Sequence, residues 1–348
     1  MYRAVLARDT RYDGIFFTAV RTTGIFCRPS CPAKKPERRN IEFFASARDA
    51  LAHGFRPCKR CRPLELPGQT PEFVRLLLAE LDRDPMRRLR DTDLRARGVD
   101  PTKVRRWFKR HHGMTFHAYQ RARRLATALD GLARGEEITR VAYGSGYDSL
   151  SGFQEALRQI TGRPASRSRG VTVVRLSRVL TPLGPMLLGA TDEGVCLLEF
   201  TDRPMLETQL RRLTRRLDCA LAPGSNEVSR QLEAELAAYF KGTLREFRTP
   251  LITPGSEFQQ RVWSALREIP YGETRSYAEQ AHAIGAPAAV RAVARANGDN
   301  RIAIAIPCHR VVGANGALTG YGGGLRRKQW LLHHERATLE RPPSDRRP

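Results

Sequence analysis

Two parts of this chain contain cysteines whose neighbours or spacing suit sulfur chemistry. Four of the seven cysteines fall in one short stretch, as Cys27-Arg-Pro-Ser-Cys31 and Cys58-Lys-Arg-Cys61. A fifth, Cys308, precedes a histidine in Ile306-Pro-Cys-His-Arg-Val-Val312. The thiolate is both the metal ligand and the nucleophile, and a nearby base or cation favours it. The two groups therefore predict a metal site and a separate nucleophile.

The paired cysteines predict one zinc site. Two close pairs separated by a loop supply four ligands to a tetrahedral ion, so the expected ligands are Cys27, Cys31, Cys58 and Cys61. A structural zinc contributes roughly 10–16 kcal/mol to the folding of a small domain, which suits a segment with so thin a core. Two disulfides or free thiols are the alternative, and the cytosolic environment expected below disfavours disulfides.

The formal charge of such a site has a consequence for its reactivity. Four thiolates on one Zn²⁺ leave two negative charges, which repel phosphate and keep the sulfurs nucleophilic. Alkylation of one sulfur would leave a single negative charge and weaken the repulsion of DNA. The spacing therefore allows a chemical switch in addition to a structural role.

Composition indicates a polyanionic partner. Lys plus Arg is 60 and Asp plus Glu is 36, a net charge of +24, and +17 of it falls in residues 1–170. Nucleic acid is the first expectation and anionic lipid a distant second, while a generic Arg-rich protein is the alternative. No run approaches 18 apolar residues, which excludes a membrane span. The N-terminus has charges where a secretory signal needs an apolar stretch, so we expect a cytoplasmic protein.

The 348 residues change pattern several times along the chain. Residues 1–66 combine Arg, Pro and Cys with short strand-like runs such as 14–20. From Glu72 to about Arg167 the pattern is helical, with Phe73, Leu76, Leu77 and Leu81 at helical spacing. Residues 171–200 have strand signals, 203–248 indicate helices with loops, and helical periodicity returns from 254. Linkers are expected at 64–71 and 163–170, and a disordered tail at 341–348.

The first cysteine motif carries a family resemblance. Phe26-Cys-Arg-Pro-Ser-Cys31 followed by Gly54-Phe-Arg-Pro-Cys-Lys-Arg-Cys61 resembles the N-terminal domain of Ada-type DNA methylation-repair proteins, over about residues 1–66. The resemblance implies that Cys27 takes a methyl group from a methylphosphotriester in the DNA backbone. Only an uncharged phosphotriester can approach a dianionic zinc–thiolate closely, so the family chemistry agrees with the charge argument.

The helical middle contains two candidate helix-turn-helix units. In the first, Gly98 lies in the turn and Pro101 begins a helix whose shared face is formed by Val104, Trp107, Phe108 and His111. In the second, a helix with Ile138, Val141 and Ala142 precedes a turn at 144–146 and a helix with Leu150, Phe153, Leu157 and Ile160. An ordinary helical bundle is the alternative, because the signal is weak by itself.

Two such units joined by a helix at about 113–133 resemble the AraC-type DNA-binding domain. The resemblance implies that the second helix of each unit enters the major groove. The candidate groove-facing residues are Lys103, Arg106 and Arg110 in the first unit and Ser149, Ser151 and Gln154 in the second. The leading helix of the first unit, 90–97, departs from the family pattern because it is short and charged where an apolar Leu-Ala face is usual.

The second cysteine motif also carries a resemblance. Pro307-Cys-His-Arg310 resembles the active site of O6-alkylguanine-DNA alkyltransferases, over about residues 171–335. By position, the resemblance implies that Cys308 is the methyl acceptor and that Asn300 steadies the active-site turn. His309, working through a water, and Glu335 would complete a Cys–His–carboxylate relay. On Cys308 and His309 alone, buried packing is the alternative. The remaining cysteines, Cys196 and Cys219, lie in apolar surroundings and are expected in the core.

The alkyltransferase resemblance also implies DNA contacts. Tyr277 helps to rotate the nucleotide and hydrogen-bonds the base, Arg291 fills the vacated stack, and Tyr321 with the Gly322 backbone walls the base pocket. Independently, O6 of a stacked base can be reached only when the base leaves the helix, at a cost of about a few kcal/mol. Residues 276–296 predict a helix, a turn at Gly285 and an alanine-rich helix beginning at Ala286-Pro287, from which Arg291 and Arg295 project.

The sequence thus predicts a multidomain α+β protein. Its expected parts are a small zinc-binding domain at 1–66, an all-α AraC-type double helix-turn-helix domain at 72–167, a ribonuclease H-like α/β lobe at 171–250, and a helical, winged-helix-like alkyltransferase lobe at 254–340.

The predicted function is DNA repair by single-turnover methyl transfer, from O6-methylguanine to Cys308 and from methylphosphotriesters to Cys27. Methylation of Cys27 would convert the protein into a transcriptional activator of the alkylation response. One Zn²⁺ is the expected cofactor; alkylated and promoter double-stranded DNA, and RNA polymerase during activation, are the expected partners of a monomer. Two alternatives stay open: a non-catalytic zinc-stabilised AraC-type factor that binds alkylated DNA, and a thiol hydrolase built on Cys308 and His309.

Overall fold

The computed structural model describes residues 1–340 except 10–11, 14–15, 46, 62, 64–69, 165–166 and 169. The chain divides into two compact units, residues 1–71 and the residues from Glu72 onward. Most of the linker expected at 64–71, part of the one at 163–170 and the whole tail 341–348 lie outside the described residues. The division into four domains stays a prediction.

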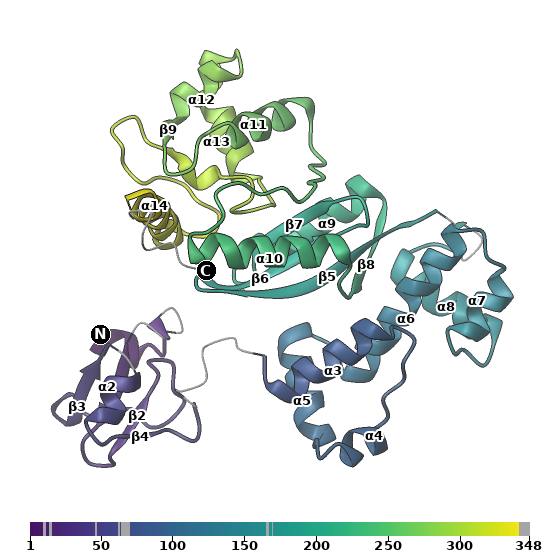
Figure 1. The fold of residues 1–348 in the computed structure, drawn as a ribbon, viewed down its shortest axis with the longest axis horizontal. Helices are drawn as coiled ribbons and strands as arrows, with labels where there is room; N and C mark the ends of the chain where they lie inside the picture. The colour runs from purple at the N-terminus through teal and green to yellow at the C-terminus, as the bar shows by residue number, and fades with distance from the viewer. Residues whose placement is uncertain are drawn as a thin grey trace. The chain divides into compact units, whose positions relative to one another are not determined.

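The N-terminal unit is a four-stranded sheet with short helices (Figure 1). The strands are β1 (Phe17–Val20), β2 (Ile25–Cys27), β3 (Ile41–Phe44) and β4 (Arg56–Pro57), in the order β3-β1-β2-β4. The helices are α1 (Tyr2–Leu6), α2 (Ala47–Ala52) and a short 3₁₀ turn, Arg38–Asn40. Among its described residues, the unit has two small buried clusters, one of Phe17, Ala19, Phe26 and Ala50 and one of Ala4, Val5 and Phe16, so it has little apolar burial to stabilise it.

The second unit begins with six helices, four of which form two helix-turn-helix pairs (Figure 1). They are α3 (Glu72–Arg83), α4 (Asp91–Ala96), α5 (Pro101–His112), α6 (Phe116–Ala133), α7 (Ile138–Gly144) and α8 (Leu150–Thr161). Helix α6 joins the pairs as expected, and Gly98 and Gly146 take positive φ angles in the two turns. Val104 and Phe108 of α5 are fully buried, as are Phe153 and Leu157 of α8, so both predicted apolar faces are confirmed.

The apolar face predicted for α3 is wrong at one position. Leu76 is 61% exposed, whereas Val74, Leu77 and Leu81 are buried. The buried stripe runs through Val74, and Leu76 lies about 100° around the helix from Leu77, on the solvent side.

A four-stranded sheet follows the helices, in the order β7-β6-β5-β8. Its strands are β5 (Thr172–Thr181), β6 (Gly184–Ala190), β7 (Val195–Phe200) and β8 (Cys219–Pro223), and β8 alone runs parallel to its neighbour. Helix α9 (Leu206–Leu217) packs on one face with Leu197, and α10 (Glu227–Lys241) packs on the other with Leu198. Strand β8 corrects the helix-and-loop prediction for 203–248: its alanines and proline are poor strand formers, and pairing with β5 overrides that preference.

The helix-turn-helix segment and the sheet share a core, which is why the chain from Glu72 forms one compact unit. Leu129 of α6 and Phe153 of α8 pack with Val173 of β5 and with Ala220 of β8. An ion pair between Arg175 and Asp130 closes the edge of this contact. The predicted core positions of Cys196 and Cys219 are confirmed, with 0% and 6% exposure.

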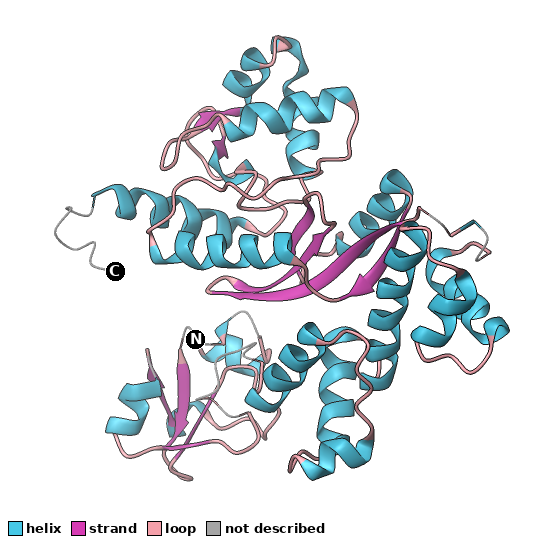
Figure 2. Cartoon of the chain, turned by 45° about the vertical axis from the view of Figure 1, so that its right-hand side comes forward, coloured by secondary structure: helices cyan, strands magenta, loops and turns pink. Residues whose placement is uncertain are grey.

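The C-terminal lobe is mostly helical and packs on the α10 face of the sheet (Figure 2). Its elements are α11 (Glu257–Arg267), β9 (Arg275–Ser276), α12 (Tyr277–Ala283), a 3₁₀ turn Pro287–Ala289, α13 (Val290–Gly298), a 3₁₀ turn Cys308–Arg310, β10 (Val311–Val312) and α14 (Leu325–Glu340). The expected turn at Gly285 has φ +70°, and the helix expected from Ala286-Pro287 starts as the 3₁₀ turn before α13. Among the described residues, no helix is both long and apolar enough to span a membrane.

Candidate metal centre and thiol site

The four N-terminal cysteines converge on one point. Cys27 ends β2, and the Cys58 N–H donates to the Phe26 carbonyl at 3.0 Å, so the pairing of β2 with β4 brings the two Cys pairs together. The turn at Cys31 is closed by its N–H to the Arg28 carbonyl at 3.1 Å. All four Sγ atoms lie within 4.8 Å of one another, and none is in a disulfide. The disulfide alternative is therefore wrong.

This donor set fits Zn²⁺. Zn–S bonds of about 2.3 Å place the four sulfurs of a tetrahedron about 3.8 Å apart, which agrees with the crowding seen here. Hydrogen bonding to the Cys31 and Cys61 sulfurs, with burial, raises the pKa of the Cys27 thiol well above its ordinary value. A divalent cation reverses that effect, because a thiol that coordinates it is deprotonated outright.

The four sulfurs differ in their surroundings. Cys31 and Cys58 are each 7% exposed, whereas Cys27 and Cys61 are half-buried. Cys61 accepts the backbone N–H of Arg28 at 3.4 Å, which withdraws charge from that sulfur. Within the described part of the chain, no backbone donor to Cys27 is found. The two half-buried sulfurs therefore differ, because a backbone donor withdraws charge from Cys61, whereas Cys27 contacts the Cys31 and Cys61 sulfurs.

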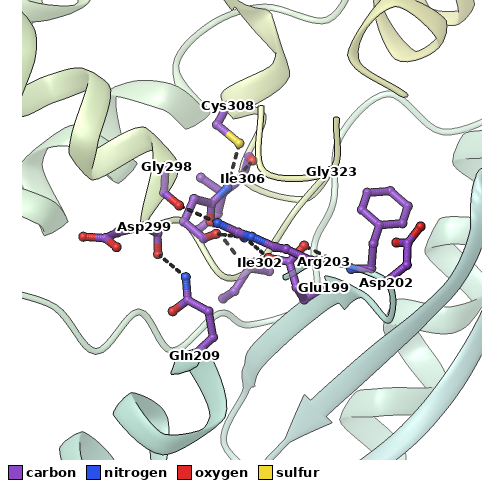
Figure 3. A network of polar contacts seen from close by, with 12 residues as sticks. Glu199, Asp202, Arg203, Gln209, Gly298, Asp299, Ile302, Ile306, Cys308 and Gly323 are labelled. Carbon is purple, nitrogen blue, oxygen red and sulfur yellow. Dashed lines mark hydrogen bonds and ion pairs between the residues drawn. The ribbon is translucent and has the colours of Figure 1, made fainter. Parts of the chain in front are cut away.

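The second thiol, Cys308 (Figure 3), is held by a buried asparagine, Asn300. The Asn300 Nδ2 donates to the Cys308 Sγ at 3.2 Å and to the Ile306 carbonyl at 2.9 Å, and its Oδ1 accepts the Ile302 N–H at 3.0 Å. Ile304, between them, has φ +72°, so the 302–306 run is a tight turn and not a strand. Asn300 therefore fixes both ends of the loop that presents the sulfur.

A buried histidine and carboxylate follow the thiol. The His309 Nε2 lies 2.8 Å from the Glu335 Oε1, and both side chains have no exposure. Glu335 accepts two further bonds to its oxygens from Arg310, at 2.9 and 3.0 Å, one from the Tyr239 hydroxyl at 2.8 Å and one from the Gly272 N–H at 3.0 Å. Five donors around one carboxylate hold it rigidly.

The charges of this network follow from burial and pairing. Burial alone would raise the pKa of Glu335, but the His309 and Arg310 partners outweigh it and hold that pKa well below its usual range. Burial lowers the pKa of His309 against the pull of Glu335, so a neutral imidazole is favoured. Burial raises the pKa of Cys308, and the Asn300 donor opposes the rise. Among the described residues, the His309 Nδ1 has no hydrogen-bond partner.

Two tyrosines and a glycine-rich loop stand beside the thiol. The Tyr277 hydroxyl lies 3.4 Å from both the Thr319 and the Gly320 carbonyls, and the Tyr321 ring meets the His309 ring edge-on with centroids 6.4 Å apart. The buried Lys328 donates to the Val311 carbonyl at 2.5 Å and to the Thr319 carbonyl at 2.6 Å, which fastens this loop.

The expected DNA-facing side chains are exposed. On α13, Arg291 and Arg295 point to solvent while Val293 and Ala296 are buried. Lys103, Arg106 and Arg110 on α5 and Gln154 on α8 are also exposed. Ser149 and Ser151 are exposed too; the Ser149 hydroxyl also caps α8 by accepting the Gly152 N–H at 3.2 Å, and Ser151 donates to it.

Sequence reasoning missed several members of the Cys308 site. Arg310 lies in the motif and had a local signal, since a cation beside a Cys-His pair needs a carboxylate partner. Tyr239 comes from α10, 96 residues before Glu335, and no local pattern marks it. Lys328 lies between Arg327 and Gln329, so no local pattern marks it as buried.

Comparison with known proteins agrees with this geometry. Three family models match the chain: "Metal binding domain of Ada" at residues 1–64, "Helix-turn-helix domain" at 94–170, and "6-O-methylguanine DNA methyltransferase, DNA binding domain" at 257–337. The bifunctional transcriptional activator/DNA repair enzyme Ada of Escherichia coli is 39% identical over 98% of this chain and 97% of its own length.

Two other relatives match the C-terminal half. The methylated-DNA–protein-cysteine methyltransferase of Mycolicibacterium paratuberculosis is 53% identical over 42% of this chain and 89% of its own length. The crystal structure of the O6-methylguanine methyltransferase of Mycobacterium tuberculosis is 44% identical and covers 49% of this chain and 96% of its own, with a TM-score of 0.42.

Proposed function

Because this chain belongs to the Ada family of bifunctional transcriptional activators and DNA repair enzymes, we propose that it repairs DNA at two separate sulfurs and that repair at one of them controls transcription. The protein is a methylated-DNA–[protein]-cysteine methyltransferase that binds DNA and uses zinc. The observation that carries the residue assignments is the buried series Asn300–Cys308 and His309–Glu335, next to a loop that can wall a base pocket.

At the buried site, Cys308 is the acceptor for the methyl group of O6-methylguanine. His309 takes the thiol proton through a water at its Nδ1, and Glu335 stabilises the resulting imidazolium. The thiolate attacks the methyl carbon, so an S–C bond forms while the C–O6 bond breaks and its electron pair stays on the guanine. The guanine then takes up a proton, and we propose the Tyr277 hydroxyl, which lies beside the 319–320 loop, as its donor.

Access to that methyl group requires base flipping. Tyr277, Tyr321 and the Gly322 backbone receive the extruded base, and Arg291 occupies its place in the stack. Arg295 holds the DNA backbone. The product is a thioether without a good leaving group, so each protein molecule acts once at this sulfur.

At the zinc site, Cys27 accepts a methyl group from a methylphosphotriester. Cys27, Cys31, Cys58 and Cys61 hold the ion, which keeps the sulfurs ionised near neutral pH. The Cys27 sulfur attacks the methyl carbon, an S–C bond forms, and the phosphate oxygen leaves with the electron pair as an ordinary anionic diester. The backbone N–H that Cys61 accepts from Arg28 withdraws charge from that sulfur, which favours Cys27 as the acceptor.

Methylation of Cys27 removes one of two negative charges from the zinc site and so reduces repulsion of DNA. We infer that the methylated protein then binds promoter DNA through the exposed Lys103, Arg106, Arg110 and Gln154, and recruits RNA polymerase. The protein acts as a monomer in the cytoplasm, a reducing compartment in which free thiols persist. Methylation of Cys27 should therefore raise promoter affinity; equal affinity before and after it would contradict the switch.

The experiment that tests the proposal is intact-mass analysis followed by peptide mapping. Zinc-loaded protein is incubated with DNA carrying O6-methylguanine, methylphosphotriesters, or both. Two added methyl groups are expected with both lesions, one at Cys27 and one at Cys308, and Cys308→Ala should add only one. Methyl groups on neither sulfur, or turnover beyond one event for each sulfur, would exclude the proposal and favour a binding protein or a hydrolase.

A further inference from the structure

A buried ion pair from the sheet lobe lies beneath the loop that presents Cys308 (Figure 3). Glu199, near the end of β7, has no exposure and pairs with Arg203, which is 8% exposed. The other Glu199 oxygen accepts the Phe200 N–H at 3.0 Å. The chemistry proposed above uses neither charge. Burying an ion pair is costly and often no better for stability than apolar packing, so its retention here calls for another role.

The Arg203 guanidinium reaches the backbone that carries Asn300. Its Nη1 donates to the Asn300 carbonyl at 3.1 Å and its Nη2 donates to the Gly298 carbonyl at 2.5 Å. These carbonyls lie at the end of α13, directly before the loop to Cys308. Because the guanidinium is planar and its donors are fixed, two carbonyls bonded at once set the direction of the Asn300 side chain. That side chain ends 3.2 Å from the reactive sulfur.

The same guanidinium also supports the glycine-rich loop on the other side of the site. A Cβ atom at Gly322 would lie 2.6 Å from the Arg203 Cζ, and one at Gly323 would lie 2.7 Å from the Phe200 ring. The absence of side chains at these glycines is therefore a packing requirement. Arg327 completes the contact, since it lies 4.0 Å over the Phe200 ring and donates to the Gly323 carbonyl at 3.0 Å.

We propose that Arg203, held in place by Glu199, is a positioning residue for alkyl transfer that sets Asn300 against the Cys308 sulfur and Gly322 against the base pocket. The inference rests on the proposed transfer to Cys308. Arg203 touches neither the reacting sulfur nor the base, so it acts through Asn300 and through the loop. A sheet lobe that holds no reacting group thereby controls the geometry of the reaction.

The titratable groups that face Cys308 give this role a distinct signature. They come from several elements: His309, Tyr277, Tyr321, Lys328, Glu199 and Arg203. Burial is the largest influence on the Cys308 pKa and raises it; the Asn300 donor lowers it, Glu199 raises it and Arg203 lowers it. Burial raises the pKa of Glu199 and Arg203 lowers it, so without Arg203 the Glu199 side chain carries its charge only at higher pH. Loss of Arg203 alone therefore removes an influence that lowers the Cys308 pKa and, at high pH, leaves the Glu199 charge to raise it, whereas loss of both charges removes the two opposing influences together.

The test measures single-turnover methyl transfer from duplex DNA containing O6-methylguanine, at several DNA concentrations and pH values. For Arg203→Met we expect the rate at saturating DNA to fall by about 10- to 100-fold, as for a misplaced reacting group, with half-saturating DNA within about twofold of wild type. Its rate–pH curve should move to higher pH. The double variant Glu199→Gln/Arg203→Met should stay slow at saturation, while its rate–pH curve returns to the wild-type position.

Two further variants keep the test decisive if Arg203→Met folds poorly. Arg203→Lys retains the charge and can reach one carbonyl, so it should react about tenfold more slowly with an unmoved rate–pH curve. Arg230→Met removes an exposed arginine, paired with Glu227 on α10, and should match wild type. The inference would be overturned if Arg203→Lys and the double variant both reacted at the wild-type rate at saturating DNA. It would also be overturned if folded Arg203→Met had the same rate–pH curve as the wild type. Absence of transfer in the wild-type protein would instead remove the proposed function itself.

Discussion

The two reactive sulfurs of this chain are stabilised in opposite ways. Cys27 lies half-buried in a small unit with a core of few side chains, and its neighbours are three other sulfurs. Cys308 lies in the largest core of the molecule, where Asn300, His309 and Glu335 are fixed by hydrogen bonds. A directly bound cation can therefore stabilise a thiolate with little protein around it. Buried dipoles and a proton acceptor do so only when a whole lobe positions them.

Removal of zinc should separate the two sites most strongly. A chelator should unfold residues 1–71, because structural zinc contributes about 10–16 kcal/mol to small domains and the remaining core is thin. Transfer to Cys27 should disappear, and transfer to Cys308 should continue at its normal rate. Circular dichroism and transfer assays on the same sample measure both effects. A zinc-free protein that still accepts methyl groups at Cys27 would contradict this contrast.

Replacement of the buried nucleophile should have the next largest effect. Cys308→Ala should abolish transfer from O6-methylguanine, because no acceptor sulfur remains at that site, and leave phosphotriester transfer unchanged. The matched control is Cys219→Ala, which removes another buried thiol far from the relay and should keep both transfers. Labelled methyl groups followed on DNA of each kind provide the measurement. Residual O6 repair by Cys308→Ala would point to a second acceptor.

Glu335→Gln should cost stability as well as rate. The change leaves Arg310 without its buried partner and His309 without the group that stabilises its protonated form, so we expect a loss of about 3–5 kcal/mol in unfolding free energy. The lowered pKa of Glu335 means that its stabilisation is present above the unfolded pKa, near 4.3, and is lost as pH falls through the folded value. Denaturant titrations of both proteins should therefore converge as pH is lowered. A difference that is constant with pH would argue against an ionised Glu335.

Tyr239→Phe should have the smallest effect. It removes one of five donors to Glu335 and leaves the ring in the core, so the expected loss is about 1 kcal/mol of stability and a severalfold slower transfer to Cys308. Chemical denaturation and single-turnover assays measure the two. His334, whose ring bonds the Tyr239 carbonyl, should not be disturbed. A loss as large as that of Glu335→Gln would mean that the hydroxyl has a direct part in the proton transfer.

The parts of this structure that could be predicted from sequence have local spacing. The two Cys pairs and the Pro-Cys-His-Arg motif each lie within a few residues, so their chemistry is visible in the sequence. Glu199 and Arg203 have helical spacing but lie at the end of a strand. Arg203 bonds the Asn300 carbonyl, 97 residues away, so this contact could not be predicted from local sequence. Strand β8 was missed because its alanines carry no strand signal, and Leu76 was misplaced because adjacent leucines in α3 do not show which one faces the core.

The contrast between the two sulfurs is tested most directly by their rates against pH in one sample. Zinc-loaded protein is mixed with DNA carrying both lesions, and methyl transfer to Cys27 and to Cys308 is followed separately between about pH 6 and pH 9. Transfer to Cys27 should be nearly flat, because its sulfur is already ionised on the metal, and transfer to Cys308 should rise with pH, because burial raises the pKa of that thiol. Two rates that rise in parallel would contradict the account.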